Sequence, residues 1–167
     1  MTTADNQQER LRFIGWIVGF TDGEGCFSIS VIKNKTTSLG YQVFPEFVIT
    51  QGAKSLAVLE SIRDFFQCGN IYINRRYDNH KEPLYRYCVR SVSDLQTTII
   101  PFFKKYSLHT AKKDDFSVFT EAVDFIAERK HLSKEGLEII VILKSKMNRK
   151  ILRDYTSESV GSPTDKI

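Results

Sequence analysis

The sequence predicts an α+β domain of the order αββαββα, in which a four-stranded antiparallel sheet shaped like a saddle carries its helices on one face. Two observations predict this fold. A segment with the apolar spacing of a helix is followed twice by two segments that alternate as strands do. The 167 residues are also 41% hydrophobic and 12% aromatic, which suits one packed core and hardly two. We expect residues 1–155 to form this domain and residues 156–167 to form a loose tail.

The first helix is expected from Arg10, where apolar residues are so continuous that the helix should be buried on most sides. It should end at Asp22-Gly23-Glu24-Gly25, because two glycines within four residues stop a helix and allow a sharp turn. Alternating residues then predict strands over 26–33 and 41–51, which form a long hairpin. Pro45 predicts a bulge or an unpaired position in the second strand.

The second half of the domain follows the same order. A helix with one apolar face should cover the hairpin, two strands follow it, and three more helices complete the chain. Ser93 is a candidate cap for the first of these three, Pro101 should interrupt it, and Ser133 should cap the last. The expected ranges are 54–66 for the covering helix, 70–77 and 84–91 for the strands, and 93–100, 114–128 and 133–147 for the remaining helices.

Charge and cysteine content limit the partners and the compartment. The 24 Lys and Arg against 20 Asp and Glu give a formal charge of +4, which suits a polyanionic partner and equally an ordinary solvated surface. Cys26, Cys68 and Cys88 are odd in number and widely spaced, so we expect neither a disulfide framework nor a zinc site. Without a long apolar stretch or a secretory signal, we expect a soluble protein in a reducing intracellular compartment and no membrane partner.

The end of the first helix carries the most informative residues. Gly15 and Gly19 lie four residues apart on one helix face, where small residues let a second helix approach or seat the helix against its own sheet. Residues 17–25 resemble the nine-residue signature of the LAGLIDADG homing endonucleases through Gly19, Asp22, the acid Glu24 and Gly25. The resemblance also includes the element order, Thr50-Gln51, residues 100–103, and Lys112-Lys113 before Asp115-Phe116.

This resemblance implies an assembly and a substrate. In the family, two such helices pack around a twofold axis at the centre of a DNA site, so a single copy of the signature implies a homodimer. A symmetric dimer then reads a pseudopalindromic double-stranded DNA site, one half with each sheet. The residues expected in the dimer interface are Gly15, Trp16, Gly19, Phe20 and Asp22, of which Asp22 is interpreted as structural.

The resemblance also implies a chemistry. Glu24 is the expected metal ligand, assisted by the backbone carbonyl of Gly23, and the metal is Mg²⁺ or another divalent cation such as Mn²⁺. Gln51 stands at the family's place for a polar residue near the attacking water. Lys112 is the expected lysine that stabilises charge on the phosphate, with Lys113 as the reserve candidate.

The open face of the sheet is the expected DNA surface. Side chains two residues apart share a face of a strand, so counting from Glu24 and Thr50 selects one row on each strand, although a bulge at Pro45 would reverse the second row. Arginine suits guanine in the major groove, and Glu46 suits cytosine. The expected DNA contacts are Ser28, Ser30, Ile32, Asn34, Gln42, Phe44, Glu46, Val48, Thr50, Lys54, Tyr72, Asn74, Arg75, Arg76, Arg86, Cys88 and Arg90.

Three functions share this fold. A site-specific homing endonuclease that makes a double-strand break is the main hypothesis, and its gene would lie in a mobile intron or intein. The alternatives are a maturase that binds intron RNA and assists splicing, and a DNA-binding regulator that does not cleave. Glu24 and Gln51 favour cleavage, because an acid that faces phosphates repels DNA unless a metal neutralises it. An organelle and a bacterial or archaeal cytoplasm are both open as the compartment.

Overall fold

The computed structural model describes residues 3–74 and 83–147 of the chain. The elements, in chain order, are α1 (Thr3–Glu24), β1 (Gly25–Lys33), β2 (Tyr41–Gly52), η1 (Ala53–Ser55), α2 (Leu56–Phe66), β3 (Asn70–Asn74), β4 (Leu84–Val89), α3 (Val92–Asp94), η2 (Leu95–Ile99), α4 (Ile100–Lys105), α5 (Lys112–Ala127), η3 (Lys130–Leu132) and α6 (Lys134–Met147). None of the described helices combines the length and the apolar character that a bilayer crossing requires.

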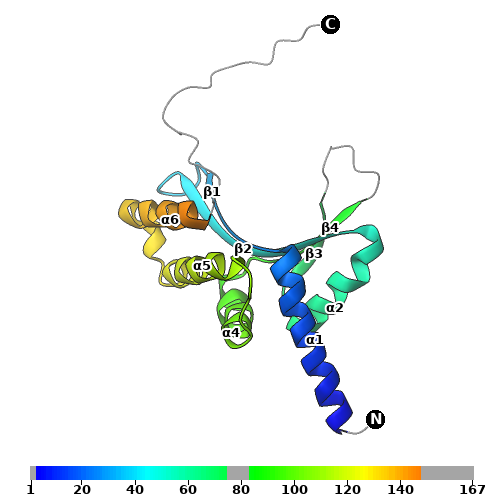
Figure 1. Ribbon diagram of the computed structural model, residues 1–167. Coiled ribbons are helices and arrows are strands. Elements are labelled where there is room, and N and C mark those ends of the chain that lie inside the picture. The colour runs from blue at the N-terminus through cyan, green and yellow to red at the C-terminus, as the bar shows by residue number, and fades with distance from the viewer. Residues whose placement is uncertain (1–2, 75–82, 148–167) are drawn as a thin grey trace, which may run out of the picture.

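The four strands form one sheet in the order β1-β2-β4-β3, and every neighbouring pair is antiparallel. The helices lie on one side of this sheet, which we call the closed face (Figure 1). None of the described elements covers the opposite side, which is concave and which we call the open face (Figure 1). The predicted α+β fold with a four-stranded saddle and helices on one face is therefore confirmed.

Aromatic side chains fill the closed face. Phe47 on β2 is fully buried, and its ring centroid lies 5.0 Å from that of Phe27 on β1 and 5.6 Å from that of Phe103 on α4. Phe119 on α5 packs against Phe27 at 5.3 Å. These contacts hold the helices against the sheet and fix which side chains of β1 and β2 point away from it.

The α1 helix buries only one of its faces. Ile17 and Val18 belong to the core, whereas Gly15, Gly19 and Gly23 are exposed, and a Cβ added at any of the three would meet no atom within 4 Å. We call these three residues the glycine strip. The prediction that α1 is buried on most sides is wrong for the single chain, because its apolar residues exceed what its own sheet covers. The alternative that the glycines seat α1 against its own sheet is also wrong.

The β2 strand runs without a bulge at Pro45. Pro45 pairs in register with Ile29 of β1, and the pairing continues regularly on both sides of it. The predicted bulge or unpaired position is wrong, because β4 pairs with β2 only from Phe47 onward. At Pro45 the missing N–H therefore breaks no hydrogen bond to β4.

The helical segment after β4 also differs from the prediction. Its cap is Ser91, whose side chain accepts a hydrogen bond from the Asp94 N–H at 3.2 Å, so the prediction of Ser93 is wrong. Pro101 does not interrupt the segment, because the π-turn over Leu95–Ile99 leads directly into α4. The wider π-turn shifts the preceding carbonyls, which a proline ring would otherwise contact. The predicted cap Ser133 is confirmed, since its hydroxyl accepts from the Gly136 N–H at 2.9 Å.

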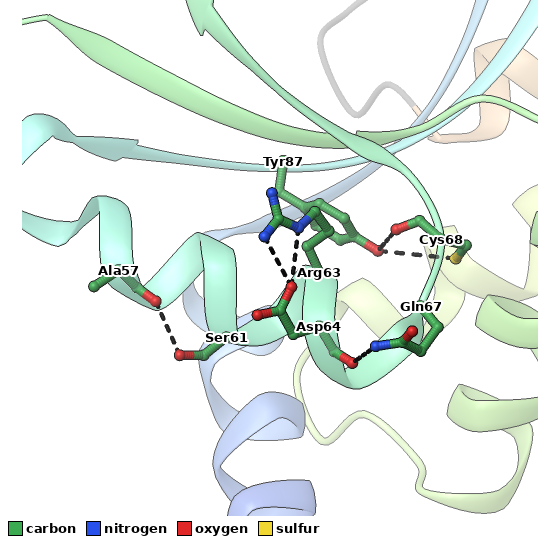
Figure 2. A network of polar contacts seen from close by, with 7 residues as sticks. All are labelled: Ala57, Ser61, Arg63, Asp64, Gln67, Cys68 and Tyr87. Carbon is green, nitrogen blue, oxygen red and sulfur yellow. Dashed lines mark hydrogen bonds and ion pairs between the residues drawn. The ribbon is translucent and has the colours of Figure 1, made fainter.

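The end of α2 is fastened to the sheet through Tyr87. Tyr87 of β4 points into the closed face, and its hydroxyl donates to the backbone carbonyl of Cys68 at 3.0 Å (Figure 2). The chain turns here through left-handed conformations at Gln67 and Gly69. A Cβ at Gly69 would lie 2.8 Å from the carbonyl oxygen of Cys88, so glycine is required for the close approach. This turn sets the start of β3 beside β4.

Candidate active site

The α1 helix passes into β1 without a connecting loop. Glu24 is the last residue of the helix and Gly25 the first of the strand. A Cβ on Gly25 would lie 2.6 Å from Thr21 Cγ2 and 2.8 Å from the Thr21 carbonyl oxygen, so only glycine fits this turn. The turn leaves the Glu24 side chain exposed at the end of α1 that joins the sheet.

Glu24 and Gln51 meet although they are 27 residues apart in the chain. The Gln51 side-chain amide Nε2 donates to Glu24 Oε2 at 3.3 Å. The contact arises because Gly25 pairs with Ile49, which brings the end of β2 beside the end of α1. The structure thus brings together the two residues that the sequence assigned to the metal and to the attacking water.

Lys112 is the lysine that reaches this junction. It begins α5, and its Nζ donates to the backbone carbonyl of Gly25. Lys113 is exposed, and its backbone N–H donates to the Thr110 carbonyl at 3.0 Å. Of the two predicted lysines, the described contacts place Lys112 beside Glu24 and leave Lys113 on the surface.

Asp22 holds the loop that leads into α5. Its Oδ2 accepts the His109 N–H at 2.8 Å, and its Oδ1 accepts the Thr110 N–H at 3.1 Å and the Thr110 hydroxyl at 2.7 Å. Burial alone would raise the pKa of Asp22, but these hydrogen bonds outweigh it and hold the pKa below its ordinary value. Asp22 therefore positions the segment that carries Lys112, which agrees with its interpretation as a structural residue.

The donors at this junction suit a hard divalent cation but do not complete its coordination. A carboxylate from Glu24 and the carbonyl of Gly23 are oxygen ligands of the kind that Mg²⁺ prefers. Residues 3–74 and 83–147 contain no group of three or more His, Cys, Asp and Glu side chains that would hold a metal ion. Within these residues, Glu24 is therefore not part of a larger cluster of metal-ligating side chains.

The strand pairing places one set of predicted DNA contacts on the open face. Ser28 pairs with Glu46, Val48 with Cys88, and Tyr72 with Arg86, so these side chains share the face opposite Phe47. By the same register the open face carries Ser28, Ser30, Ile32, Gln42, Phe44, Glu46, Val48, Thr50, Tyr72, Arg86 and Cys88.

The remaining predicted contacts differ in their surroundings. Asn34 follows β1, and its side-chain amide donates to Gln42 Oε1 at 2.8 Å, whereas Lys54 lies exposed in η1. Arg75 and Arg76 fall outside the described residues, and Asn74 is described only as a backbone position of β3.

Two residues of the open face are nevertheless buried. Val48 is 8% exposed and Cys88 is 3% exposed. Burial raises the pKa of the Cys88 thiol to about 12, and its hydrogen bond to Glu46 acts in the same direction. Among the predicted DNA contacts whose side chains the structure describes, these two are the least accessible.

Glu46 lies in a cluster of charges that the sequence did not predict. Its Oε1 pairs with Arg86 Nη2, and its Oε2 pairs with Arg90 Nε. Burial would raise the pKa of Glu46, but hydrogen bonds from Cys88 and Arg90 and the charge of Arg86 hold it below its ordinary value. The sequence signal that could have predicted this ion pair is the opposite charge of two residues on adjacent strands. Phe47 pairs with Val89, so the next position along the two strands sets Glu46 opposite Arg90.

Comparison with known proteins agrees with this geometry. The family model described as LAGLIDADG endonuclease matches residues 17–123. The chain is 33% identical over 132 residues to "Probable intron-encoded endonuclease 2" of Neurospora crassa, covering 79% of this chain and 26% of that protein. It is 26% identical to "DNA endonuclease I-CvuI" of Chlorella vulgaris, covering 84% of this chain and 90% of that protein.

Solved structures show the same fold. The homing endonuclease I-TnaI superposes with a TM-score of 0.73 and 38% identity, covering 82% of this chain and 88% of that one. The LAGLIDADG homing endonuclease I-SmaMI bound to cleaved DNA gives a TM-score of 0.75 and 32% identity, covering 83% and 45%. The chain spans about a quarter of the length of the Neurospora relatives that it matches. By its signature, its sheet and the extent of this match, the chain belongs to the LAGLIDADG endonuclease family.

Proposed function

We propose that the protein is a homing endonuclease that binds a long double-stranded DNA site on its open face and hydrolyses both strands. The observation that supports this most directly is the Glu24–Gln51 contact at an exposed helix end, with Lys112 beside it. Family membership supports the same reaction, since I-SmaMI is described as bound to cleaved DNA. An origin in an intron is part of the proposal, because several curated relatives are named as intron-encoded.

The proposed roles follow from the contacts. Glu24 and the Gly23 carbonyl hold Mg²⁺ or Mn²⁺, which when bound neutralises phosphate charge and lowers the pKa of water. Gln51 donates to one Glu24 oxygen through Nε2, which fixes the carboxylate and leaves its own amide oxygen to orient the attacking water. Lys112, held over Gly25, places a positive charge near the phosphate that is cleaved.

The assembly that we propose is a homodimer through α1. The glycine strip faces open space, and Trp16 beside it is 40% exposed, so a second helix can approach closely along this face. A second copy of the chain would bring a second Glu24 to the same axis and so add a carboxylate to the one that the described residues place there. Asp22, engaged by His109 and Thr110, contributes to this interface by holding the helix end.

The first experiment changes only the proposed metal ligand. Glu24→Gln keeps the side-chain size and removes the charge, so cleavage of a site selected from a randomised library should fall by about a hundredfold or more in Mg²⁺. Binding to the same site in Ca²⁺, measured by gel shift, should persist. Glu60→Gln, an exposed change on α2, is the matched control and should cleave as the wild type does. Equal cleavage by Glu24→Gln would remove the assignment.

The outcome for the wild type separates the alternatives. A non-cleaving regulator would bind its site in Mg²⁺ without cutting it. A maturase would bind intron RNA and increase the rate of splicing. Either result without DNA cleavage would contradict the proposed endonuclease.

The second experiment tests the interface. Gly19→Leu adds a side chain where the single chain leaves open space, so the monomer should fold while the dimer is blocked. Sedimentation should show a dimer for the wild type and a monomer for Gly19→Leu. Ala57→Leu, at an exposed position of α2, should remain dimeric. A wild type that stays monomeric on DNA would contradict the proposed homodimer.

A further inference from the structure

Four side chains on the open face form a connected group, which we call the Glu46 cluster: Glu46, Tyr72, Arg86 and Arg90. Glu46 joins two arginines, and the Arg90 guanidinium carbon lies 5.9 Å from the centroid of the Tyr72 ring. The cluster spans three adjacent strands, because β4 lies between β2 and β3. Glu46 lies in the middle of β2, opposite Ser28, whereas Arg86 and Tyr72 lie level with Thr50, closer to the end of β2.

The register explains why Arg86 is held in an unusual direction. Arg86 pairs with Thr50, whereas Glu46 lies four residues away along β2. Four residues of strand are about 13 Å, so the Arg86 side chain must run along the sheet over the Val48–Cys88 pair to reach Glu46. That path accounts for the burial of Val48 and Cys88 on an otherwise open face.

Arg90 is held from two sides. Its Nε pairs with Glu46 and its guanidinium lies over Tyr72, so the plane of the group is fixed by an ion pair and a ring. Because the ion pair with Glu46 uses Arg90 Nε, it does not use the end edge of the guanidinium, where each Nη presents one N–H. Two parallel donors at the tip are the arrangement that pairs with O6 and N7 of guanine.

The charge of Glu46 is costly on a DNA-binding surface. Its side chain is 13% exposed and lies between arginines that are 29% and 53% exposed, so it is the least accessible member of both ion pairs. Both of its oxygens already accept from arginine and the Cys88 thiol donates to it as well, so most of its roughly four acceptor positions are taken before a cytosine amine could approach. An acid that lowers the net charge of this surface and cannot face a base must act on its neighbours.

We propose that Glu46 is a positioning residue that orients Arg86 and Arg90 to read guanine in the major groove, and that it makes no base contact of its own. This inference rests on the proposed DNA-binding function of the open face. It replaces the expectation that Glu46 accepts from cytosine. Without Glu46, the two arginines would turn to the nearest phosphates, which bind any sequence.

The test compares sequence preference among variants. Wild type, Glu46→Gln, Arg86→Ala and Arg90→Ala would each select sites from a randomised duplex library in Ca²⁺, followed by gel-shift titration. Arg86→Ala and Arg90→Ala identify the positions that each arginine reads, where the wild type should prefer guanine by about 5- to 150-fold. Glu46→Gln should lose most of the preference at both positions.

Binding to an unrelated duplex provides a readout that damage to the fold would not produce. Glu46→Gln should bind unrelated DNA more tightly than the wild type does. The dependence of its log affinity on log salt should steepen by about 0.9 for each arginine that turns to a phosphate. Glu60→Gln removes the same negative charge far from the open face and should leave the sequence preference unchanged.

Several results would overturn the inference. Guanine preference that is unchanged in Glu46→Gln, or a loss of cytosine preference instead, would each contradict it. If Glu46→Gln does not fold, Glu46→Asp keeps the charge but shortens the reach, so it should lose the preference read by Arg86 first, and no loss would contradict the inference. A wild type that selects no sequence would remove the proposed function together with this inference, whereas a selective wild type matched by Glu46→Gln would remove only the inference.

Discussion

Adjacent residues of one strand point to opposite faces of the sheet, and the two faces hold their side chains in different ways. Phe47 and Glu46 are neighbours on β2, yet Phe47 is fully buried among aromatic rings and Glu46 is held by two arginines on the opposite face. The closed face gains its free energy from apolar burial, which does not depend on direction. The open face gains little from burial and depends on how its charged groups are oriented. We therefore expect substitutions on the two faces to affect different measurements.

The largest expected loss of stability comes from the closed face. Phe47→Ala removes a fully buried ring and leaves a cavity, so the free energy of unfolding should fall by about 3–5 kcal/mol in urea denaturation. Phe44→Ala, a partly exposed aromatic of the open face on the same strand, is the matched control and should cost much less. Equal losses would contradict the division between the faces.

A smaller loss of stability is expected at the end of α1, where Asp22 holds the loop before α5. Asp22→Asn weakens hydrogen bonds to His109 and Thr110, so the free energy of unfolding at pH 7 should fall by about 1–3 kcal/mol. Because Lys112 follows this loop, cleavage should also slow. Asp64→Asn on α2 is an exposed control that should change neither quantity. A loss of stability with unaltered cleavage would show that the loop does not position Lys112.

The smallest effect is expected on the open face and depends on pH. The pKa of Glu46 in the folded protein lies below its ordinary value of 4.5, so its ionised form stabilises the fold fully above about pH 4.5. That stabilisation is lost as the pH falls through the folded pKa. The free energy of unfolding of Glu46→Gln should therefore lie about 1 kcal/mol below the wild type at pH 7, and the gap should shrink below pH 4.5. A gap that is constant down to pH 3 would contradict the ionised cluster.

The sequence was sufficient to predict side-chain placement where one periodic rule applies over a whole strand. Counting by twos from Glu24 and Thr50 assigned the side chains of β1 and β2 to the correct faces, because a buried closed face fixes the register of a strand. The resemblance to the family singled out Glu24 and Gln51 separately, and the structure brings their side chains into contact.

The sequence was insufficient where a feature depends on a particular neighbour. The apolar residues of α1 do not distinguish burial against its own sheet from an interface that the single chain leaves open. Pro45 interrupts no hydrogen bond between strands only because β4 does not extend far enough to pair with it. Pro101 is accommodated only because a π-helical turn precedes it. The Glu46 cluster depends on side-chain directions over three strands, which no local pattern specifies.

The absence of a loop between α1 and β1 has a geometric consequence for a nuclease. Glu24 and the side chains of β1 follow one another without a loop, so the spacing from Glu24 to Ser28 is set by four residues, about 13 Å. In the proposed function, that length corresponds to about four base-pair steps of 3.4 Å and fixes the distance between the cut and the proposed base contact at Ser28. One residue inserted after Gly25 would increase this spacing and would also turn every side chain of β1 to the opposite side of the sheet.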